Sequence, residues 1–243
     1  MFAGATAAAA APPTRSIPVL RALADEAGRR LEKAPAQDIL GWALEEFHPY
    51  LAIASSMSDA LLVEMAAAIR PDVPVVFLDT GYHFPETLGT RDAVQTVYPV
   101  ELVTVRPAQS VAVQDATLGP RLYERNPELC CRLRKVEPLE RGLAPYRAWA
   151  SGIRRDEAAT RGTIRVVEWD AKREKVKINP LARWTAADVT RYLEEHHVLV
   201  NPLHGDGYAS IGCAPCTRRT GPGEDARSGR WTGRNKVECG IHA

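Results

Sequence analysis

The chain has 243 residues, of which 45% are hydrophobic and 25% are charged. These fractions are typical of a folded globular protein and exclude a mostly disordered chain, a coiled coil or a collagen-like repeat. The formal net charge is +1, which argues against a protein that coats nucleic acid. No uncharged apolar run is long enough to cross a bilayer, so we expect no membrane-spanning segment.

An alanine-rich stretch opens the chain. Residues 3–11 are small and apolar, and Pro12-Pro13 follow them. A secretory signal would begin with basic residues and contain a leucine-rich core, and this stretch has neither feature. We therefore predict a disordered leader over residues 1–15 and a cytoplasmic protein.

The following elements alternate between helix and strand. Helical spacing of apolar residues predicts helix within 16–47, and a short apolar run predicts a buried strand over 51–54. The same reasoning predicts a helix over 60–69 and strands over 73–78, 101–105 and 147–150. This alternation argues for an α/β fold with a mainly parallel, twisted sheet and helices on both faces. Ligands bind beyond the carboxyl ends of such strands, which here are the loops 55–59, 79–87 and 151–161.

The pattern changes in the last third of the chain. Residues 164–168 and 175–178 are typical of a hairpin, and Thr185 with Asp188 forms a capping-box pattern for a helix running to His196. From Asn201 onward glycine and proline are dense and periodicity ends. A stretch of about 40 residues without periodicity is either disordered or functional. We therefore separate a nucleotide-binding domain, 16–200, from a C-terminal segment, 201–243.

The chain contains five cysteines and no export signal, which indicates metal or redox chemistry rather than a disulfide framework. Four of them form two close pairs, Cys130-Cys131 and Cys213-Ala-Pro-Cys216. Four thiolates suit tetrahedral zinc or a cubane iron–sulfur cluster. Adjacent cysteines are unusual for zinc, so the spacing favours iron and sulfur. Cys239 remains as a candidate reactive thiol, because Lys236 and His242 place positive charge near it.

Basic residues gather around these cysteines. Segment 121–135 carries five basic and two acidic residues, and segment 213–243 carries six basic and three acidic residues, a local charge of +3 in each. Segment 151–161 adds three arginines. Such clusters in a nearly neutral chain indicate a small polyanion as ligand, because Arg and Lys form charge-assisted hydrogen bonds to phosphate and sulfate.

Several motifs together resemble one enzyme family. They are Cys130-Cys-Arg-Leu-Arg-Lys135, Ile211-Gly-Cys-Ala-Pro-Cys-Thr217, Glu238-Cys-Gly-Ile-His242, Phe77-Leu-Asp-Thr-Gly81 with His83 and Pro85-Glu-Thr87, Gly152-Ile-Arg-Arg155 and Ser228-Gly-Arg-Trp231. The combination resembles the assimilatory adenylyl-sulfate reductases, from about Leu51 to Ala243.

The resemblance implies an adenine nucleotide α-hydrolase-like fold, related to the PP-loop ATP pyrophosphatases. It implies reduction of adenosine 5′-phosphosulfate (APS) to sulfite and AMP, in sulfate assimilation and cysteine biosynthesis, with thioredoxin as reductant. Cys239, on a mobile C-terminal tail, would be the nucleophile and would carry an S-sulfo intermediate. One 4Fe–4S cluster would be held by Cys130, Cys131, Cys213 and Cys216.

The resemblance also assigns substrate contacts. The residues expected to hold the phosphosulfate are Lys135, Arg227, Arg230 and His242. Arg161 and Gly152 would line the nucleotide site, Ser55, Ser56 and Asp59 would form its first loop, and Leu78 and Thr80 its adenosine pocket. Lys135 would also link the cluster to the substrate through its charge.

One departure from the family pattern and three competing hypotheses remain. The parent PP-loop pattern is glycine-rich, whereas Ser55-Ser-Met-Ser-Asp59 contains no glycine, which disfavours an ATP-cleaving enzyme. The first hypothesis is that the 3′-phosphorylated substrate (PAPS) replaces APS, although four cluster cysteines favour APS by resemblance. The second is a zinc-bearing nucleotide-binding protein that transfers sulfur, and the third is a redox-sensing regulator without turnover. The sequence leaves a homo-oligomer open.

Overall fold

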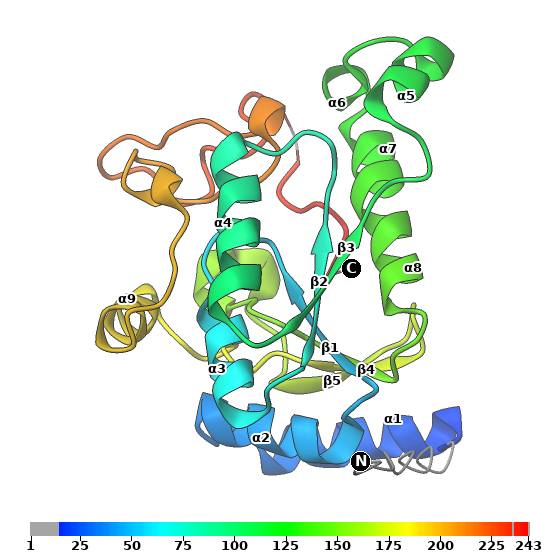
Figure 1. The fold of residues 1–243 in the computed structure, drawn as a ribbon, viewed down its shortest axis with the longest axis vertical. Helices are drawn as coiled ribbons and strands as arrows, with labels where there is room; N and C mark the ends of the chain where they lie inside the picture. The colour runs from blue at the N-terminus through cyan, green and yellow to red at the C-terminus, as the bar shows by residue number, and fades with distance from the viewer. Residues whose placement is uncertain (1–14, 235, 243) are drawn as a thin grey trace, which may run out of the picture.

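A six-stranded sheet runs through the centre of the molecule, with helices packed on both of its faces (Figure 1). The computed structural model describes residues 15–234 and 236–242. All but the last residue of the predicted leader therefore lies outside the described residues. Every pair of neighbouring strands is parallel except β5 with β6, so the expected mainly parallel α/β sheet is confirmed.

The elements follow one another as expected for alternating strands and helices. The strands are β1 (Leu51–Ser55), β2 (Pro74–Leu78), β3 (Glu101–Val105), β4 (Ala148–Ser151), β5 (Val167–Asp170) and β6 (Lys175–Ile178), in the spatial order β3-β2-β1-β4-β6-β5. The α-helices are α1 (Ile17–Arg30), α2 (Ala36–Phe47), α3 (Leu61–Ile69), α4 (Pro85–Val97), α5 (Val111–Leu118), α6 (Leu122–Arg125), α7 (Pro127–Cys131), α8 (Glu137–Leu143) and α9 (Ala186–Glu195). A π-helical turn, Arg132–Val136, joins α7 to α8. Short 3₁₀ turns cover Arg155–Glu157, Ala159–Arg161, Pro202–His204 and Ala214–Cys216.

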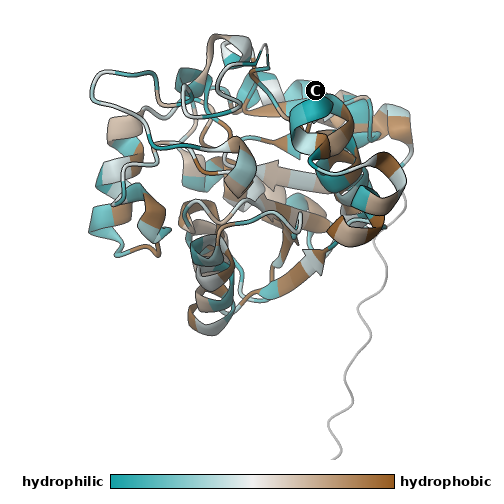
Figure 2. Ribbon diagram, turned by 90° about the horizontal axis from the view of Figure 1, so that it is seen from above, coloured by the Kyte–Doolittle hydropathy of each residue, from teal (hydrophilic) through white to brown (hydrophobic). Residues whose placement is uncertain are grey.

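The strands direct alternate side chains into two hydrophobic layers, as the two-residue period of a strand requires. Leu51 and Ile53 of β1 lie in the larger core with residues of α1, α2 and α3. Ala52, between them, packs on the opposite face with Trp149 of β4 and Leu139 of α8. The strands β1, β2 and β4 are largely apolar, and Figure 2 shows that most helices carry both apolar and polar residues. Burial on both faces explains why the strands appear in the sequence as continuous apolar runs.

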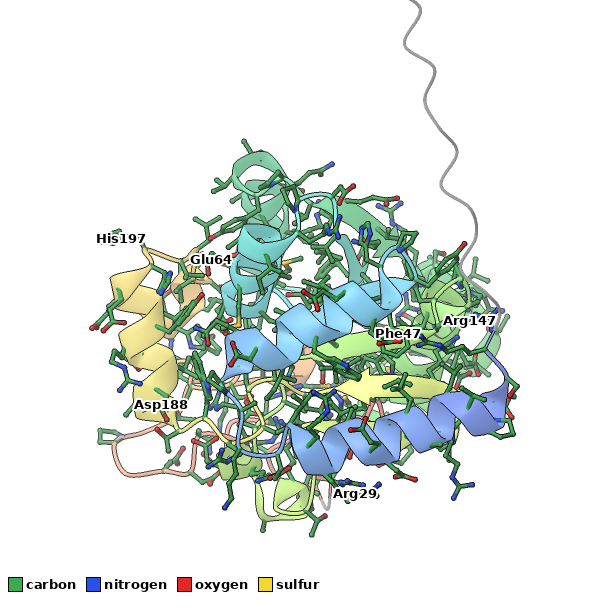
Figure 3. The ribbon with its side chains drawn as sticks, turned by 90° about the horizontal axis from the view of Figure 1, so that it is seen from below. Arg29, Phe47, Glu64, Arg147, Asp188 and His197 are labelled. Atoms are coloured by element: carbon green, nitrogen blue, oxygen red, sulfur yellow. The ribbon has the colours of Figure 1, made fainter. Side chains whose placement is uncertain are left out.

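The structure matches the predicted strands closely but divides the first helical region. Helix predicted within 16–47 is two helices, separated by residues 31–35. The capping box is confirmed: the Thr185 hydroxyl accepts from the Asp188 N–H at 3.2 Å, and the Asp188 carboxylate accepts from the Thr185 N–H at 2.9 Å. Asp188 and His197 mark the two ends of α9 in Figure 3.

The strand order places a topological switch point beside β1. Chain connections run from β1 toward β2 on one side, while β4 lies on the other side of β1. In such sheets ligands bind beyond the carboxyl ends of the strands at this switch point. Ser55, Leu78 and Gly152 lie at or directly after the carboxyl ends of β1, β2 and β4, as predicted for the site loops.

Within the described residues, no helix is both long and apolar enough to cross a membrane.

Candidate active site

Four cysteines from two distant segments line one cavity. Cys130 and Cys131 end α7, while in the C-terminal segment Cys213 precedes a 3₁₀ turn and Cys216 ends it. Cys130, Cys131 and Cys213 are buried, and Cys216 is partly buried. The other residues that line the cavity are Tyr82, Tyr123, Pro127, Arg134, Lys135, Pro215 and Trp231.

A short helix with a well-formed start presents the adjacent pair. The Asn126 side chain accepts from the Leu129 N–H at 3.0 Å, and Pro127 occupies the first turn, which are both favourable helix-start features. The helix then widens into the π-helical turn that carries Lys135. Such turns occur frequently at functional sites. No element was predicted here from the sequence.

The loop after β2 holds the second cysteine pair in place. The Ala214 N–H donates to the Tyr82 carbonyl at 2.7 Å, and the Thr80 hydroxyl lies 3.4 Å from Cys213 Sγ. The Trp231 N–H also donates to the Cys216 carbonyl at 3.1 Å. Thr80, expected in an adenosine pocket, is therefore buried against a cysteine thiol.

The donor set around the cavity consists of four thiols, which suit an iron–sulfur cluster and are also found at zinc sites. Among the described residues, no three His, Cys, Asp or Glu side chains are arranged to hold one metal ion. Burial, followed by repulsion from the thiolates of Cys131, Cys213 and Cys216, raises the pKa of Cys130 to about 12. Burial likewise raises the pKa of Cys131 to about 11. A cationic iron core ligated by all four sulfurs would offset this cost.

Lys135 lies between the cavity and the fifth cysteine. Burial by itself lowers the pKa of Lys135, but the negative charges of the Cys213, Cys239 and Cys131 thiolates outweigh burial, and the pKa is raised. Lys135 is therefore a partly buried cation that lines the four-thiol cavity and lies near Cys239. Cys239 is partly buried, so the C-terminal segment brings the predicted nucleophile to the predicted phosphosulfate site.

Two of the expected anion-binding arginines are already paired with carboxylates. Arg161 donates to Glu238 through Nε at 2.6 Å and Nη2 at 2.9 Å, and it also pairs with Glu157. Arg227 Nη2 lies 3.3 Å from the same Glu238 carboxylate. Burial lowers the pKa of Arg161, but these carboxylates outweigh it and raise the pKa. Glu238 was part of a recognised motif, but the sequence assigned it no role.

The ring of His242, near the C-terminus, stacks on the ring of Trp149 in β4. The two ring centroids are 6.0 Å apart and nearly parallel. Burial, and then the positive charges of Lys177 and Arg161 among others, lowers the pKa of His242 well below its usual value. Arg173 also lies 5.5 Å from the Trp149 ring. The sequence pointed to His242 but not to Lys177, Arg173 or Trp149.

Arg230 lies against the loop that carries the second cysteine pair. Its Nη1 donates to the Ile211 carbonyl at 3.1 Å, and its guanidinium lies 4.6 Å from the Trp231 ring centre. A methyl group at Gly212 would come within 2.1 Å of Arg230 Nη2. Gly212 therefore allows the close approach of the arginine, which the sequence motif alone does not reveal.

The loop after β1 has the shape that a glycine would normally provide. Met57 has a φ of 58°, in the left-handed region that glycine favours, and its carbonyl accepts from Asn201 Nδ2 at 3.0 Å. The Ser55 hydroxyl accepts from the Met57 N–H at 3.2 Å, while Ser56 is exposed. Asp59 accepts from the Leu61 N–H at 3.0 Å, and burial raises the pKa of Asp59.

A larger, open depression lies at the opposite edge of the sheet. Residues before or at the start of the strands line it, including His48, Pro74 and Glu101. None of the predicted site residues is among its lining residues.

Comparisons with known proteins show the family of the chain. Residues 48–219 match the phosphoadenosine phosphosulfate reductase domain. The chain belongs to this reductase family. It is 60% identical over 228 residues to adenosine 5′-phosphosulfate reductase of Streptomyces coelicolor, covering 94% of this chain and 97% of that protein. The corresponding protein of Mycolicibacterium smegmatis is 53% identical, with 92% and 94% covered.

Solved structures share the fold. The crystal structure of phosphoadenylyl-sulfate reductase from Candida auris in its phosphate complex superposes with a TM-score of 0.68 at 29% identity, covering 80% of this chain and 96% of that one. FMN adenylyltransferase of Candida glabrata, with FMN and an ATP analogue, reaches a TM-score of 0.56 at 14% identity, with 86% and 69% covered. The second similarity concerns the fold alone. The adenine nucleotide α-hydrolase-like fold expected from the resemblance is confirmed.

Proposed function

We propose that this reductase-family chain converts adenosine 5′-phosphosulfate to sulfite and AMP, with Cys239 as nucleophile and reduced thioredoxin as electron donor. The observation that carries the proposal is the placement of the fifth thiol. Cys239 is separate from the four cavity cysteines and lies close enough to Lys135 to raise the pKa of that amine. The relatives that are 53–60% identical are adenosine 5′-phosphosulfate reductases, which supports the choice of substrate.

The first step transfers a sulfo group to the enzyme. The Cys239 thiolate attacks the sulfur of the sulfate group, a sulfur–sulfur bond forms, and the bond from sulfur to the bridging oxygen breaks. AMP leaves with that electron pair on its phosphate oxygen. Because a thiolate approaches an anionic substrate, buried positive charge is needed. Lys135, which is partly buried, provides positive charge beside Cys239, and Arg230 lies near enough to Lys135 to act on its pKa.

The second step releases the product. A thioredoxin thiolate attacks Cys239 Sγ, the sulfur–sulfur bond to the sulfo group breaks, and sulfite departs with the electron pair. The second thioredoxin thiol then resolves the mixed disulfide, so the dithiol supplies the two electrons that reduce the sulfur. This step requires Cys239 to meet a protein partner, and we therefore expect residues 236–242 to leave the site during turnover.

The four cavity cysteines are the proposed ligands of one 4Fe–4S cluster. Cys130, Cys131, Cys213 and Cys216 supply sulfur donors only, which suits iron and sulfur. When bound, the cluster would cross-link the two cysteine segments and set the electrostatic field at Lys135. A brown protein with a broad absorption band at about 400 nm would support this assignment. A colourless protein with one equivalent of zinc would refute it.

The substrate is tested by a sulfite-release assay with reduced thioredoxin. We expect turnover with adenosine 5′-phosphosulfate to exceed turnover with its 3′-phosphorylated form by at least about a hundredfold. Equal or faster release from the 3′-phosphorylated substrate would overturn the choice of substrate. Absence of sulfite from both substrates would overturn the proposed reaction.

The nucleophile is tested by Cys239→Ser. We expect sulfite release to fall by more than about a thousandfold, while the absorption band of the cluster stays unchanged, because Cys239 is not among the cavity cysteines. Cys216→Ser is the matched comparison and should lose the absorption band. Sulfite release by Cys239→Ser at the parent rate would contradict the assignment, as would an S-sulfo group trapped on another cysteine.

A further inference from the structure

Side chains rather than a backbone ladder hold the segment around Cys239. Among residues 236–242, the described part of this tail, no helix or strand is present. Lys236 is buried, with a side chain 3% exposed, and it pairs at 2.5 Å with Glu128, whose side chain is 73% exposed, so solvent screens the carboxylate of this pair. Val237 is itself largely exposed. The position of the nucleophile therefore depends on a few side-chain contacts.

The strongest of these contacts is made by the residue directly before the nucleophile. Glu238 receives two parallel hydrogen bonds from Arg161, through Nε at 2.6 Å and Nη2 at 2.9 Å. Paired bonds of this kind between a guanidinium and a carboxylate are strong and fix orientation. Arg161 is buried, with a side chain only 9% exposed, so solvent screens the pair weakly.

Further contacts close around the same carboxylate. Arg227 Nη2 lies 3.3 Å from Glu238 and donates to the Val237 carbonyl at 2.9 Å. The Thr160 hydroxyl lies 3.5 Å from Glu238. Opposite charges hold the pKa of Glu238 below its usual value despite burial, which by itself would raise it. These groups come from residues 157–161 and 227, so the contacts join the tail to two other parts of the chain.

The charges in this cluster cancel. Two guanidiniums, Arg161 and Arg227, face two carboxylates, Glu157 and Glu238. If a substrate anion displaced Glu238 from Arg161, it would also release Cys239, the next residue. The nucleophile would then be lost when it is needed. We therefore expect Glu238 to stay paired with Arg161 while the substrate anion binds near Lys135.

We propose that Glu238 is a positioning residue, which docks the tail on Arg161 and Arg227 and so places Cys239 for attack. This inference rests on the proposed function and gives the two arginines a role in holding the tail. Release of the tail for thioredoxin then requires the Glu238 contacts to break.

The test uses Glu238→Gln in the enzyme as purified. Gln keeps the shape but removes the charge, and Arg161 retains Glu157, so the variant should fold. We expect alkylation of Cys239 by iodoacetamide, followed by peptide mass spectrometry, to become about tenfold faster, and kcat for sulfite release to fall about tenfold. Affinity for AMP should change less than about twofold, and Glu238→Asp should restore part of kcat.

Glu224→Gln is the matched control, because Glu224 pairs with Arg218 at 2.8 Å in the same C-terminal segment but on the exposed surface. It should leave alkylation and kcat unchanged. Unchanged Cys239 alkylation in Glu238→Gln would overturn the positioning role, and so would a loss confined to AMP affinity. The alkylation measurement needs no turnover, so it judges Glu238 even if the parent enzyme releases no sulfite.

Discussion

Cys239 differs from the other four cysteines in its surroundings. The cavity cysteines are held by a helix end and by a turn that hydrogen-bonds to the loop after β2. Cys239 follows a carboxylate bound to Arg161 and precedes Gly240, whose φ is 79°. One group of thiols is thus held by a helix end and a turn with backbone hydrogen bonds, and the fifth thiol lies on a segment held by side chains. This difference is what separate binding and attacking roles require.

The partly buried side chain of His83, in the loop after β2, makes the stability of the fold depend on pH. His83 Nε2–H donates to the Leu78 carbonyl at 2.7 Å, its Nδ1 has no partner among the described residues, and burial lowers its pKa. A neutral ring is therefore favoured in the folded protein. Because the histidine binds a proton more readily when unfolded, stability is full above the ordinary value of 6.5 and declines as the pH falls below it.

The variant His83→Gln removes this titration. We expect the thermal midpoint of the parent protein to fall between pH 7 and pH 5 more steeply than that of the variant, by about 1–2 °C per pH unit. Exposed His197, at the end of α9 (Figure 3), provides the control His197→Gln, which should keep the parent slope. Identical slopes for His83→Gln and the parent would show that His83 does not titrate in this way.

Among the elements, the strands followed from the sequence more readily than the helices around the cysteines. A strand buried on both faces is a short apolar run, which is easy to recognise. The helical stretch through α7 and the π-helical turn instead buries Arg134, which is only 3% exposed and donates to the Gln114 side chain at 3.0 Å. A buried arginine interrupts the regular spacing of apolar residues from which a helix is predicted. In α4 the buried residues include Thr87 and Thr90, which weaken the period similarly.

Two helical glycines provide a test of how α1 packs. A methyl group at Gly28 would lie 2.3 Å from the Val167 carbonyl oxygen of β5, whereas nothing lies within 4 Å of one at Gly41 in α2. We expect Gly28→Ala to lower the free energy of unfolding by about 1–3 kcal/mol. Gly41→Ala should raise it by about 0.5–1 kcal/mol, because alanine favours helix.

Urea unfolding followed by tryptophan fluorescence measures both variants. Because both substitutions gain the same helix propensity, the difference between them isolates the contact of α1 with β5. Stabilisation of the protein by Gly28→Ala would mean that this contact is not as close as described.

At the scale of the whole molecule, the four-thiol cavity joins the α/β part of the chain to the C-terminal segment. Cys130 and Cys131 belong to the helix leading into α8, while the described residues around Cys213 and Cys216, from 201 to 234, form loops, short 3₁₀ turns and one isolated bridge between Thr217 and Arg230 (Figure 1). The backbone hydrogen bonds of this region close turns and loops and do not form a helix or a strand ladder. We therefore expect its order to depend on the ligands that the cavity holds.

Removal of iron by a chelator under oxidising conditions tests this dependence. We expect loss of sulfite release together with cleavage by trypsin in residues 217–234 at a rate about tenfold higher. The rate of cleavage within α1 should stay unchanged, because α1 packs on the sheet and contributes no residue to the cavity. Unchanged cleavage of residues 217–234 after iron loss would show that the segment folds independently of the cavity.

The sequence by itself determined the sheet, the order of its strands along the chain, the capped α9 and the family, because apolar runs, caps and motifs are local properties. It also singled out all five cysteines and most of the basic residues near them. Only the tertiary structure decided that Glu238 meets Arg161, 77 positions earlier, that Thr80 contacts Cys213, and that His242 stacks on Trp149. Such pairs form because the strand order and loop paths bring distant segments to one edge of the sheet, and no local pattern records those paths.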